Sequence, residues 1–517
     1  MKKVIIIGSG VAGTILAREL LSKGRYEIVM FEAGPGFEPG NRRIWLDHIT
    51  SENNIYDPFI DEEGYEVGNE HMPVIGARLF MKGGTTNHWG GLTPRFKPED
   101  FHLKSRTGYG SDWPISYEDL APYYTMAETL LGITGDSENN DPPRFGDRFP
   151  FAPAPFTVGD KMLMGILEDM GISYGHAALA RNANRCVTTG TCDYCPMNAR
   201  YNALYDISQL QKEHKDKLTL KTESPVVKLV MDSKKRTAGV DFVDLKKQEK
   251  KFEEADIVVI ASGTIESAKL LLVSANTDWK NGVGNHSDHL GRHLMGHPVM
   301  FAAGVKKGNP DMFYPELGFT SLLSRHFDSP RYQPTGKMWF APRIGANLPV
   351  ERGILSNTSR IDIEKTLKGG MAISAGGEME SFEDPVNRVQ LGSGKNKLGL
   401  PTTKLDFIVP EVNIKARQGH VETFKDLLKQ AGVEEDSIES ETMDPDGAHA
   451  SGTCRMSKSD TDGVVDINLQ VHGTDNLYVC SNAVFPSIAA ANPTLTVSAL
   501  AVRLAEHILG ETTKGGA

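Results

Sequence analysis

The chain contains little cysteine, no long apolar run and no cluster of basic residues. Only 5 of its 517 residues are cysteine, which is too few for a disulfide framework. No stretch approaches the roughly 18 consecutive apolar residues of a membrane-spanning helix. The apolar run Val4–Ile7 is too short for the apolar part of a signal peptide. The sequence therefore predicts a cytoplasmic protein without a membrane span, or a periplasmic one if a signal-bearing partner subunit exports it.

Charge and composition exclude further classes of protein. Acidic side chains outnumber basic ones by 67 to 56, so a nucleic-acid partner is not expected. Hydrophobic residues make up 39% and charged residues 24%, which is typical of a folded protein and not of a disordered one. At roughly 100 to 200 residues per domain, the length predicts two or three domains.

The N-terminal segment has the pattern strand, glycine turn, helix, strand. The apolar residues 4–7 predict a buried strand, and the helix-spaced apolar residues 11–21 predict a helix. Residues 27–31 predict a second strand. This βαβ order indicates an α/β fold with a doubly wound, Rossmann-like sheet.

The turn GSGVAG has the glycine spacing of a dinucleotide-binding loop. Gly8 permits a tight turn, Gly10 lets the backbone approach a pyrophosphate, and Gly13 lets the helix pack on the strand. Glu32 ends the second strand, where a carboxylate can accept hydrogen bonds from a ribose diol. The motif predicts a dinucleotide site but does not separate NAD from FAD.

The rest of the chain alternates between two patterns. Residues 218–260 and the helix expected over 264–274 continue the βα pattern of the N-terminus. Residues 298–410 contain short β-like runs between Gly and Pro residues, which predict a separate antiparallel sheet in an α+β domain. Residues 117–131 predict a helix with Ser116 at its N-cap and a capping box.

A second glycine-rich segment, KGGTTNHWGGLTPRF, covers residues 82–96. Its two glycine pairs bracket His88 and Trp89. Glycines let the backbone approach a flat ligand closely, while both side chains project from a constrained loop. The alternative interpretation is a structural glycine turn with a packed tryptophan.

A histidine and an asparagine near the C-terminus are candidate catalytic residues. His449 opens the segment HASGTCRM, and an imidazole with a pKa of about 6.5 can accept a hydroxyl proton while a hydride leaves the same carbon. Asn492 precedes Pro493 at the start of the last helix and can hydrogen-bond the same hydroxyl. Because most histidines are structural, His449 is assigned this role only in association with the other motifs.

Three of the five cysteines lie close together in the segment RCVTTGTCDYCP. Cys186, Cys192 and Cys195 have the spacing C-x5-C-x2-C, and a proline follows the last one. Three thiolates suit a [3Fe-4S] cluster. Zinc would need a fourth ligand, for which His176 is a candidate, and plain buried thiols are the third interpretation.

Taken together, these motifs resemble the glucose-methanol-choline (GMC) oxidoreductase family. The resemblance extends over nearly the whole chain and also includes ASGTIESAKLLLVS, LGRHLMGHP, and DPVNRVQL with the LGLP that follows it. It implies that His449 is the catalytic base, with Asn492 at the position where the family has either His or Asn. It also implies that the alcohol is oxidised by hydride transfer to flavin N5. The cofactor-binding residues predicted on this basis are Gly8, Gly10, Gly13, Glu32, Gly84, Asn87, His88, Asn482 and Thr494.

The family also implies a division of the chain into two domains. The FAD-binding domain is discontinuous, and the substrate domain includes the cysteine-rich segment 186–195. The predicted ranges are 1–95, 205–297 and 445–517 for the FAD-binding domain, and 96–204 and 298–444 for the substrate domain.

Within the family, the chain is similar to the large subunits of bacterial sugar dehydrogenases such as glucoside 3-dehydrogenase. That similarity implies oxidation of a ring secondary hydroxyl, with a 3-keto sugar favoured over C1, C2 or C5 products. It also implies a [3Fe-4S] cluster on Cys186, Cys192 and Cys195, through which electrons leave to an acceptor other than oxygen. A small subunit and a cytochrome acceptor are the expected partners.

Other activities of the family stay open. The segment NHW…TPRF resembles pyranose oxidase, in which a histidine at the position of His88 carries a covalent flavin. This chain has Asn-His-Trp-Gly where pyranose oxidases have Thr-His-Trp-Thr, so stacking of His88 near the flavin is the other interpretation. An oxygen-dependent oxidase, another sugar or polyol dehydrogenase, and a lyase with a structural FAD are the alternatives.

Overall fold

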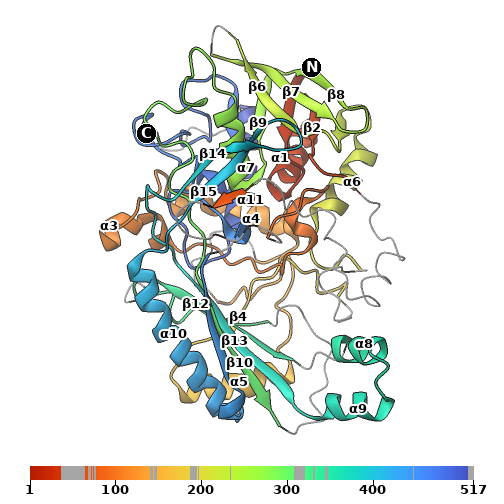
Figure 1. The fold of residues 1–517 in the computed structure, drawn as a ribbon, viewed down its shortest axis with the longest axis vertical. Coiled ribbons are helices and arrows are strands. Elements are labelled where there is room, and N and C mark those ends of the chain that lie inside the picture. Colours follow the sequence, from red (N-terminus) through yellow and green to blue (C-terminus); the bar gives the residue numbers. More distant parts are fainter. Residues whose placement is uncertain are drawn as a thin grey trace.

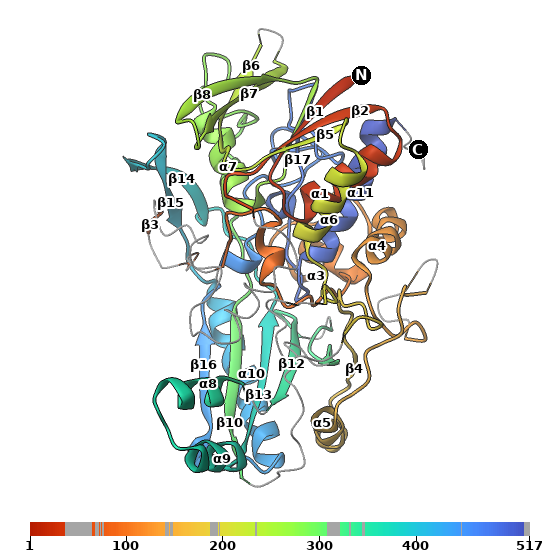
Figure 2. The same cartoon turned by 90° about the vertical axis from the view of Figure 1, so that its right-hand side faces the viewer.

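The computed structural model divides the chain into two regions, each built around a sheet. Figure 1 shows a parallel sheet and its helices in the upper region and an antiparallel sheet in the lower one, and Figure 2 shows the same division from the side. The first strand and the last helix both lie in the upper region. The structure describes residues 1–36, 65–67, 72, 74, 77–139, 144, 148–186, 195, 197–232, 235–307, 321–329, 332–343, 347–445 and 447–510.

A five-stranded parallel sheet forms the centre of the upper region. Its order is β17-β9-β1-β2-β5, so β1 has β9 on one side and β2 on the other. Strands β17, β9, β1 and β2 are mostly buried, as strands covered on both faces must be, whereas the edge strand β5 is partly exposed. This sheet confirms the predicted doubly wound fold. The strands are β1 Lys2–Ile7, β2 Tyr26–Phe31, β5 Leu218–Lys221, β9 Ile257–Ile260 and β17 Leu477–Val479.

In the described part of the chain, five helices accompany the parallel sheet. They are α1 Val11–Ser22, α4 Tyr117–Leu131, α6 Ala203–Glu213, α7 Gly263–Val273 and α11 Thr494–Leu509. Helix α11 packs against both α1 and α4. Helix α4 begins as predicted: the Ser116 hydroxyl accepts the backbone N–H of Asp119, and the Asp119 carboxylate accepts the backbone N–H of Ser116.

The lower region contains a six-stranded antiparallel sheet with the order β16-β10-β13-β12-β11-β4. Helices α5 Val158–Asp169 and α10 Glu411–Gln430 pack on it, and their apolar side chains form a second core with those of the sheet. The predicted antiparallel sheet is confirmed. Its strands are β4 Gly175–His176, β10 Val299–Lys306, β11 Leu322–Ser324, β12 Gly336–Arg343, β13 Met371–Met379 and β16 Glu439–Met443.

Two three-stranded sheets and several short helices complete the described part of the fold. The strands are β6 Val226–Met231, β7 Thr237–Asp244 and β8 Glu249–Glu254 in one sheet, and β3 Tyr65–Val67, β14 Arg388–Lys395 and β15 Pro401–Asp406 in the other. The helices are η2 Gly84–Asn87, η3 Pro98–His102, α3 Leu103–Thr107, α8 Asn347–Leu355, α9 Arg360–Lys368, η5 Glu435–Ser437, η6 Gly447–His449 and η7 Asn482–Val484. Within the described ranges, no helix combines the length and apolarity needed to cross a membrane.

The hairpin β14–β15 departs from the prediction of a single sheet over residues 298–410. It pairs with β3 and packs against α7 instead of joining the antiparallel sheet. The chain at Gly291 can approach β14 this closely only because the residue is glycine: a Cβ there would lie 2.3 Å from the carbonyl oxygen of Val389. Strands β4 and β16, which lie outside the predicted segment, complete the antiparallel sheet. The domain boundaries stay a prediction.

Candidate functional site

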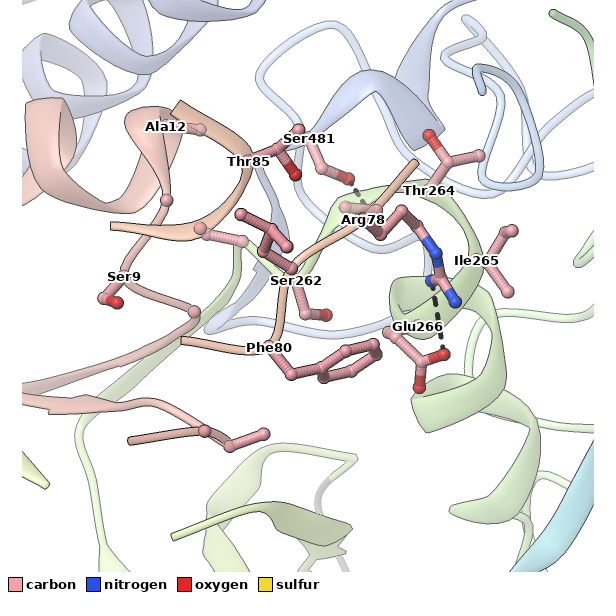
Figure 3. A pocket seen from close by; sticks show the side chains of 18 of the residues that line it. Ser9, Ala12, Arg78, Phe80, Thr85, Ser262, Thr264, Ile265, Glu266 and Ser481 are labelled. Atoms are coloured by element: carbon pink, nitrogen blue, oxygen red, sulfur yellow. Dashed lines mark hydrogen bonds and ion pairs between the residues drawn. The ribbon is translucent and has the colours of Figure 1, made fainter. Parts of the chain in front are cut away.

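A cavity of about 1190 Å³ lies at the carboxyl ends of β1 and β9. The sheet extends in opposite directions from these two strands, and a crevice opens outside the carboxyl ends at such a point. Segments that are distant in the sequence meet around it. Figure 3 shows the start of α1, the start of α7 and two loops in its wall, marked by Ser9, Ala12, Thr85, Thr264, Glu266 and Ser481.

The predicted glycine turn follows β1 directly and forms one wall of the cavity. Gly8 has a φ of +109°, and a Cβ there would lie 2.5 Å from the carbonyl oxygen of Ala261. A Cβ on Gly13 would lie 2.2 Å from the carbonyl oxygen of Gly8, so α1 packs closely on β1 only because this residue is glycine. Gly10 lines the cavity, and a Cβ there would contact nothing within 4 Å.

Glu32 also lines the cavity, at the end of β2. One carboxylate oxygen accepts the Ser9 hydroxyl at 2.7 Å and the Ser9 backbone N–H at 3.2 Å, and the other accepts the backbone N–H of Gly34 at 3.1 Å. Burial raises the pKa of Glu32, and these hydrogen bonds oppose the shift. Glu32 therefore holds the shape of the glycine turn at the position where a ribose diol was predicted.

The second glycine-rich segment forms the part of the wall next to the glycine turn, and the backbone N–H of Gly83 donates to the Ser9 hydroxyl at 3.2 Å. Gly84 and His88, two of the predicted cofactor-binding residues, line the cavity. Asn87 does not line the cavity. Its side-chain amide instead donates to the carbonyl oxygen of Gly84, in the same loop, at 2.7 Å. Arg200 donates to the backbone carbonyls of Asn87 and Trp89, and this fixes the loop from behind.

The C-terminal motif supplies the third part of the wall. Asn482, in η7, lines the cavity together with Asn492 and Thr494, and α11 begins at Thr494 as predicted. The side-chain oxygens of both asparagines are buried, and among the described residues no donor reaches either of them. Two acceptors thus stand at this end of the cavity with capacity for a ligand.

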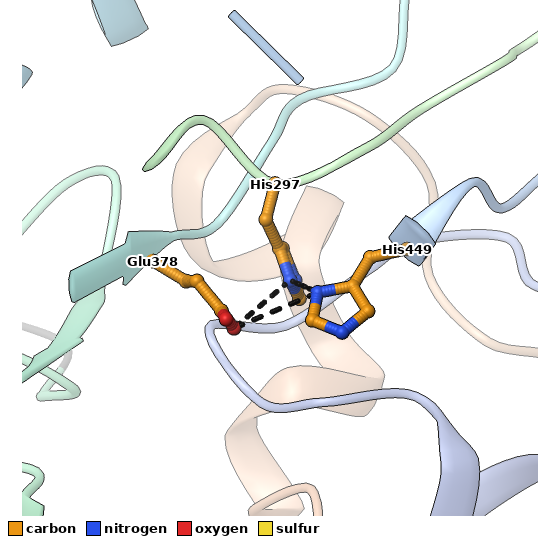
Figure 4. A group of neighbouring side chains, drawn as sticks. All are labelled: His297, Glu378 and His449. Atoms are coloured by element: carbon orange, nitrogen blue, oxygen red, sulfur yellow. Dashed lines mark hydrogen bonds and ion pairs between the residues drawn. The ribbon is translucent and has the colours of Figure 1, made fainter. Parts of the chain in front are cut away.

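His449 lies between Asn492 and two residues that the sequence analysis did not assign. Its Nε2 lies 3.2 Å from the amide nitrogen of Asn492. Its Nδ1 lies 2.9 Å from Nδ1 of His297 and 3.6 Å from a carboxylate oxygen of Glu378. Figure 4 shows that the rings and the carboxylate converge, with the second ring nitrogen of His449 pointing away from the other two residues.

Further contacts anchor this group. Nε2 of His297 lies 2.6 Å from the carbonyl oxygen of Ala489, and Glu378 forms an ion pair with Lys337, whose side chain is 0% exposed. Burial alone would raise the pKa of the Glu378 carboxyl, but the ammonium group of Lys337 above all holds it well below its usual value. Burial lowers the pKa of His297, so its ring is neutral at pH 7.

Sequence reasoning missed His297, Glu378 and Lys337 for an identifiable reason. His297 lies within LGRHLMGHP, which contributed to the family resemblance but was given no role. Lys337 and Glu378 lie on β12 and β13, more than 70 residues from His449 in the sequence. The available signal was a lysine followed by the apolar run Met338–Ala341, because a buried strand tolerates a charge only when it is paired.

The predicted cysteine site is described only in part. Cys186 and Cys195 are partly exposed thiols, whereas Cys192 lies outside the described residues. The backbone N–H of Ala199 lies 3.3 Å from Sγ of Cys195. The indole N–H of Trp89 donates to the carbonyl of Tyr201 at 2.9 Å, so the chain just after Cys195 is bonded to the loop that lines the cavity.

His176, the predicted alternative zinc ligand, lies in β4. Its ring stacks on Phe156 with a centroid separation of 3.9 Å, and its Nδ1 lies 3.3 Å from the Ser321 hydroxyl. Burial lowers the pKa of His176. His176 thus packs within the lower region, and its part in a zinc site stays a prediction.

Comparison with known proteins identifies the family. Models of the GMC oxidoreductase family match residues 159–299 and 383–501. The chain belongs to this family, which confirms the resemblance drawn from its motifs. It is therefore an FAD-dependent oxidoreductase that acts on CH–OH groups.

Individual relatives are similar over nearly their whole length. The fructose dehydrogenase large subunit of Gluconobacter japonicus is 28% identical, over 99% of this chain and 98% of the relative. Paromamine 6'-oxidase of Streptomyces fradiae is 26% identical, over 98% of this chain and 91% of the relative. Formate oxidase of Aspergillus oryzae has the same fold, with a TM-score of 0.67 and 18% identity over 99% of this chain and 98% of that one.

The residues around the cavity fit FAD. Among the described residues no side chain caps the N-terminus of α1, so its backbone N–H groups are available to a pyrophosphate, and Gly10 leaves room for one. The buried side-chain oxygen of Asn482 has acceptor capacity at the far end of the cavity. Gly8, Gly10, Glu32, Gly84, Asn482 and Thr494 are the predicted residues that would hold the cofactor, with His88 beside them.

Proposed function

We propose that this protein oxidises a secondary hydroxyl of a sugar or glycoside to a ketone, with His449 as the proton acceptor. The observation that carries the proposal is the 3.2 Å contact between Nε2 of His449 and the amide of Asn492, in the wall of the cavity that fits FAD. An acceptor and a donor side by side can together bind one hydroxyl group. Bound FAD supplies the acceptor for the hydride.

The proposed step balances in protons and electrons. The hydroxyl proton passes to Nε2 of His449, and the electrons of the broken oxygen–hydrogen bond form the carbon–oxygen double bond. The hydrogen on the same carbon leaves as a hydride, with both electrons of the carbon–hydrogen bond. Asn492 donates to the same oxygen and holds it beside His449. The ionised Glu378, 3.6 Å from Nδ1, stabilises the imidazolium that results.

The substrate class rests on the relatives. Fructose dehydrogenase and paromamine 6'-oxidase are both named for sugar-type substrates, and both are similar over nearly the whole chain. Within this class we favour C3 of a glucoside, because of the resemblance to glucoside 3-dehydrogenases. Oxidation at another hydroxyl, such as that on C5 of fructose, is the alternative.

Anaerobic reduction of the bound flavin tests the activity and the substrate together. Purified holoenzyme is mixed with methyl glucoside, in which the C1 hydroxyl is blocked, and separately with fructose. Bleaching of the flavin by the glucoside, with a 3-keto product by NMR, is the expected result. Bleaching by fructose alone would move the reaction to that sugar. A flavin that no alcohol bleaches would contradict the proposed activity and favour a structural FAD.

The proposed route for electrons leads through Cys186, Cys192 and Cys195 as ligands of a [3Fe-4S] cluster. The contacts from Cys195 through Ala199 and Tyr201 to the cavity loop support a site beside the flavin. Such a route implies a dehydrogenase with an acceptor other than oxygen. The words "large subunit" in the name of the fructose dehydrogenase relative support a small partner subunit. A cytochrome acceptor rests on the resemblance to the sugar dehydrogenases.

Metal analysis separates the cluster from its alternatives. Anaerobically purified protein should contain iron and acid-labile sulfide, and Cys186→Ser should lower both without slowing flavin reduction by the sugar. Zinc without iron would favour the zinc interpretation. Protein without iron that forms peroxide rapidly in air would favour an oxidase. Flavin that stays with the acid-denatured chain would show covalent attachment, with His88 as the candidate.

A further inference from the structure

His297 lies directly behind His449 and outside the cavity. The cavity is lined by His449, Asn492 and Glu378, whereas the side chain of His297 is 1% exposed. Asn492 contacts Nε2 of His449, and His297 contacts Nδ1. His297 therefore touches His449 at the nitrogen opposite to the one that faces a substrate.

The backbone determines where His297 carries its proton. Its Nε2 lies 2.6 Å from the carbonyl oxygen of Ala489. A carbonyl oxygen only accepts hydrogen bonds, so Nε2 must be the protonated nitrogen. Because burial keeps the ring neutral at pH 7, Nδ1 has no proton and acts as an acceptor.

Two acceptors consequently converge on Nδ1 of His449. They are Nδ1 of His297 at 2.9 Å and the ionised carboxylate of Glu378 at 3.6 Å. The geometry points to His297 as a positioning residue that keeps the proton of His449 on Nδ1 and leaves Nε2 as the acceptor. The inference rests on the proposed function only in that Nε2 of His449 receives the hydroxyl proton.

A bound cation is the other arrangement that could bring three such atoms together. The ligand atoms of His297, Glu378 and His449 all lie within 4.8 Å of one another. However, the ammonium group of Lys337 already contacts the same Glu378 oxygen, so a positive charge is present there. A second cation would be repelled by it. The hydrogen-bonded arrangement accounts for the 2.9 Å contact between the two rings without a metal.

Two substitutions of His297 separate positioning from a purely structural role. Asn places its side-chain oxygen near the position of Nδ1 and can accept from His449, but it loses the donor to Ala489. Gln places its amide near the position of Nε2 and can donate to Ala489, but it loses the acceptor for His449. The two variants therefore each retain one of the two hydrogen bonds.

Positioning predicts that the acceptor matters more than the anchor. With the alcohol identified in the bleaching experiment, His297→Asn should reduce the flavin at a rate close to that of the unchanged protein. His297→Gln should be slower by at least about tenfold, because a histidine in the wrong tautomer is a poor base. The opposite order, or equal rates in both variants, would overturn the inference.

Nuclear magnetic resonance of ring-¹⁵N-labelled histidine provides a readout that does not depend on turnover. In the unchanged holoenzyme, the signals of His449, assigned by their loss in His449→Ala, should show a protonated Nδ1 and an unprotonated Nε2. In His297→Gln the two nitrogens should become more alike. A protonated Nε2 in the unchanged protein would overturn the inference. If neither His297 variant folds, this spectrum alone decides. If no alcohol bleaches the flavin, the proposed function fails while the tautomer is still measured.

Discussion

Two parts of the cavity wall, here called the cofactor wall and the reaction wall, differ in the kind of contact that stabilises them. On the cofactor wall, the contacts come from backbone: the carbonyl of Ala261 beside Gly8, the carbonyl of Gly8 beside Gly13, and the open N-terminus of α1. On the reaction wall they come from titratable side chains, namely His449 and the buried pair of Glu378 and Lys337. The cofactor wall therefore depends on close approach of the chain to itself, and the reaction wall depends on balanced charge.

This difference predicts that the two walls fail in different ways. Removing one charge from the reaction wall leaves its partner buried without a countercharge. This lowers the free energy of unfolding, by an amount that depends on pH because the remaining group titrates. Adding a methyl group to the cofactor wall costs stability where backbone stands in the way, and costs only affinity where the cavity is open. Substitutions on each wall can therefore be matched to controls.

The largest expected effect on stability is that of Lys337→Met. The free energy of unfolding should fall by about 3–5 kcal/mol at pH 7, because Glu378 loses its buried countercharge. Glu378 has a depressed pKa in the folded state, so the stabilisation is present above the unfolded pKa of about 4.3 and is lost as the pH falls through the folded value. The difference in the free energy of unfolding between the unchanged protein and Lys337→Met should accordingly shrink as the pH falls below about 4.3.

A matched control distinguishes burial from charge alone. Lys307 pairs with Glu434 at 2.8 Å, but the two side chains are 72% and 43% exposed. Lys307→Met should change the free energy of unfolding by less than about 1 kcal/mol. The free energy of unfolding of both variants is measured by denaturant titration. An equal decrease in both would show that burial does not strengthen the contribution of the Lys337–Glu378 pair.

On the cofactor wall, Gly8→Ala should destabilise the protein by about 3 kcal/mol, because it adds strain at a positive φ to a 2.5 Å contact with backbone. Gly10→Ala should leave the stability of the apoprotein within about 1 kcal/mol. It should nevertheless weaken FAD binding by at least about tenfold, because its methyl group fills space beside the cofactor. Thermal unfolding and FAD titration measure the two effects. An apoprotein of Gly10→Ala that binds FAD at full strength would place the pyrophosphate elsewhere.

The smallest expected effect is that of Asn492→Ala. The rate constant of flavin reduction should fall by about tenfold, since one hydrogen bond of roughly 1.4 kcal/mol to the reacting oxygen is lost. Asn492→His should retain more of the rate, because an imidazole N–H can also donate to the reacting oxygen. Rapid mixing with the sugar measures both. A rate unchanged by Asn492→Ala would remove this residue from the proposed step.

The contrast between the walls also explains what could be predicted from the sequence. Gly8, Gly13 and Glu32 form one local motif, and the Ser116 cap is equally local, so spacing alone indicates their structure. Lys337 and Glu378 act as a pair only because β12 and β13 are neighbours in the sheet, which spacing does not encode. The position of Asn87, which holds its loop instead of lining the cavity, likewise depends on contacts from Arg200 and Asn202 far along the chain.

The measurement that tests the account most directly is single-turnover flavin reduction in His449→Ala with FAD fully bound. If Nε2 of His449 accepts the hydroxyl proton, the rate constant should fall by about 10²- to 10⁴-fold at neutral pH, while FAD affinity stays unchanged. A rate constant equal to that of the unchanged protein would contradict the account, because the proton would then leave the alcohol by another route.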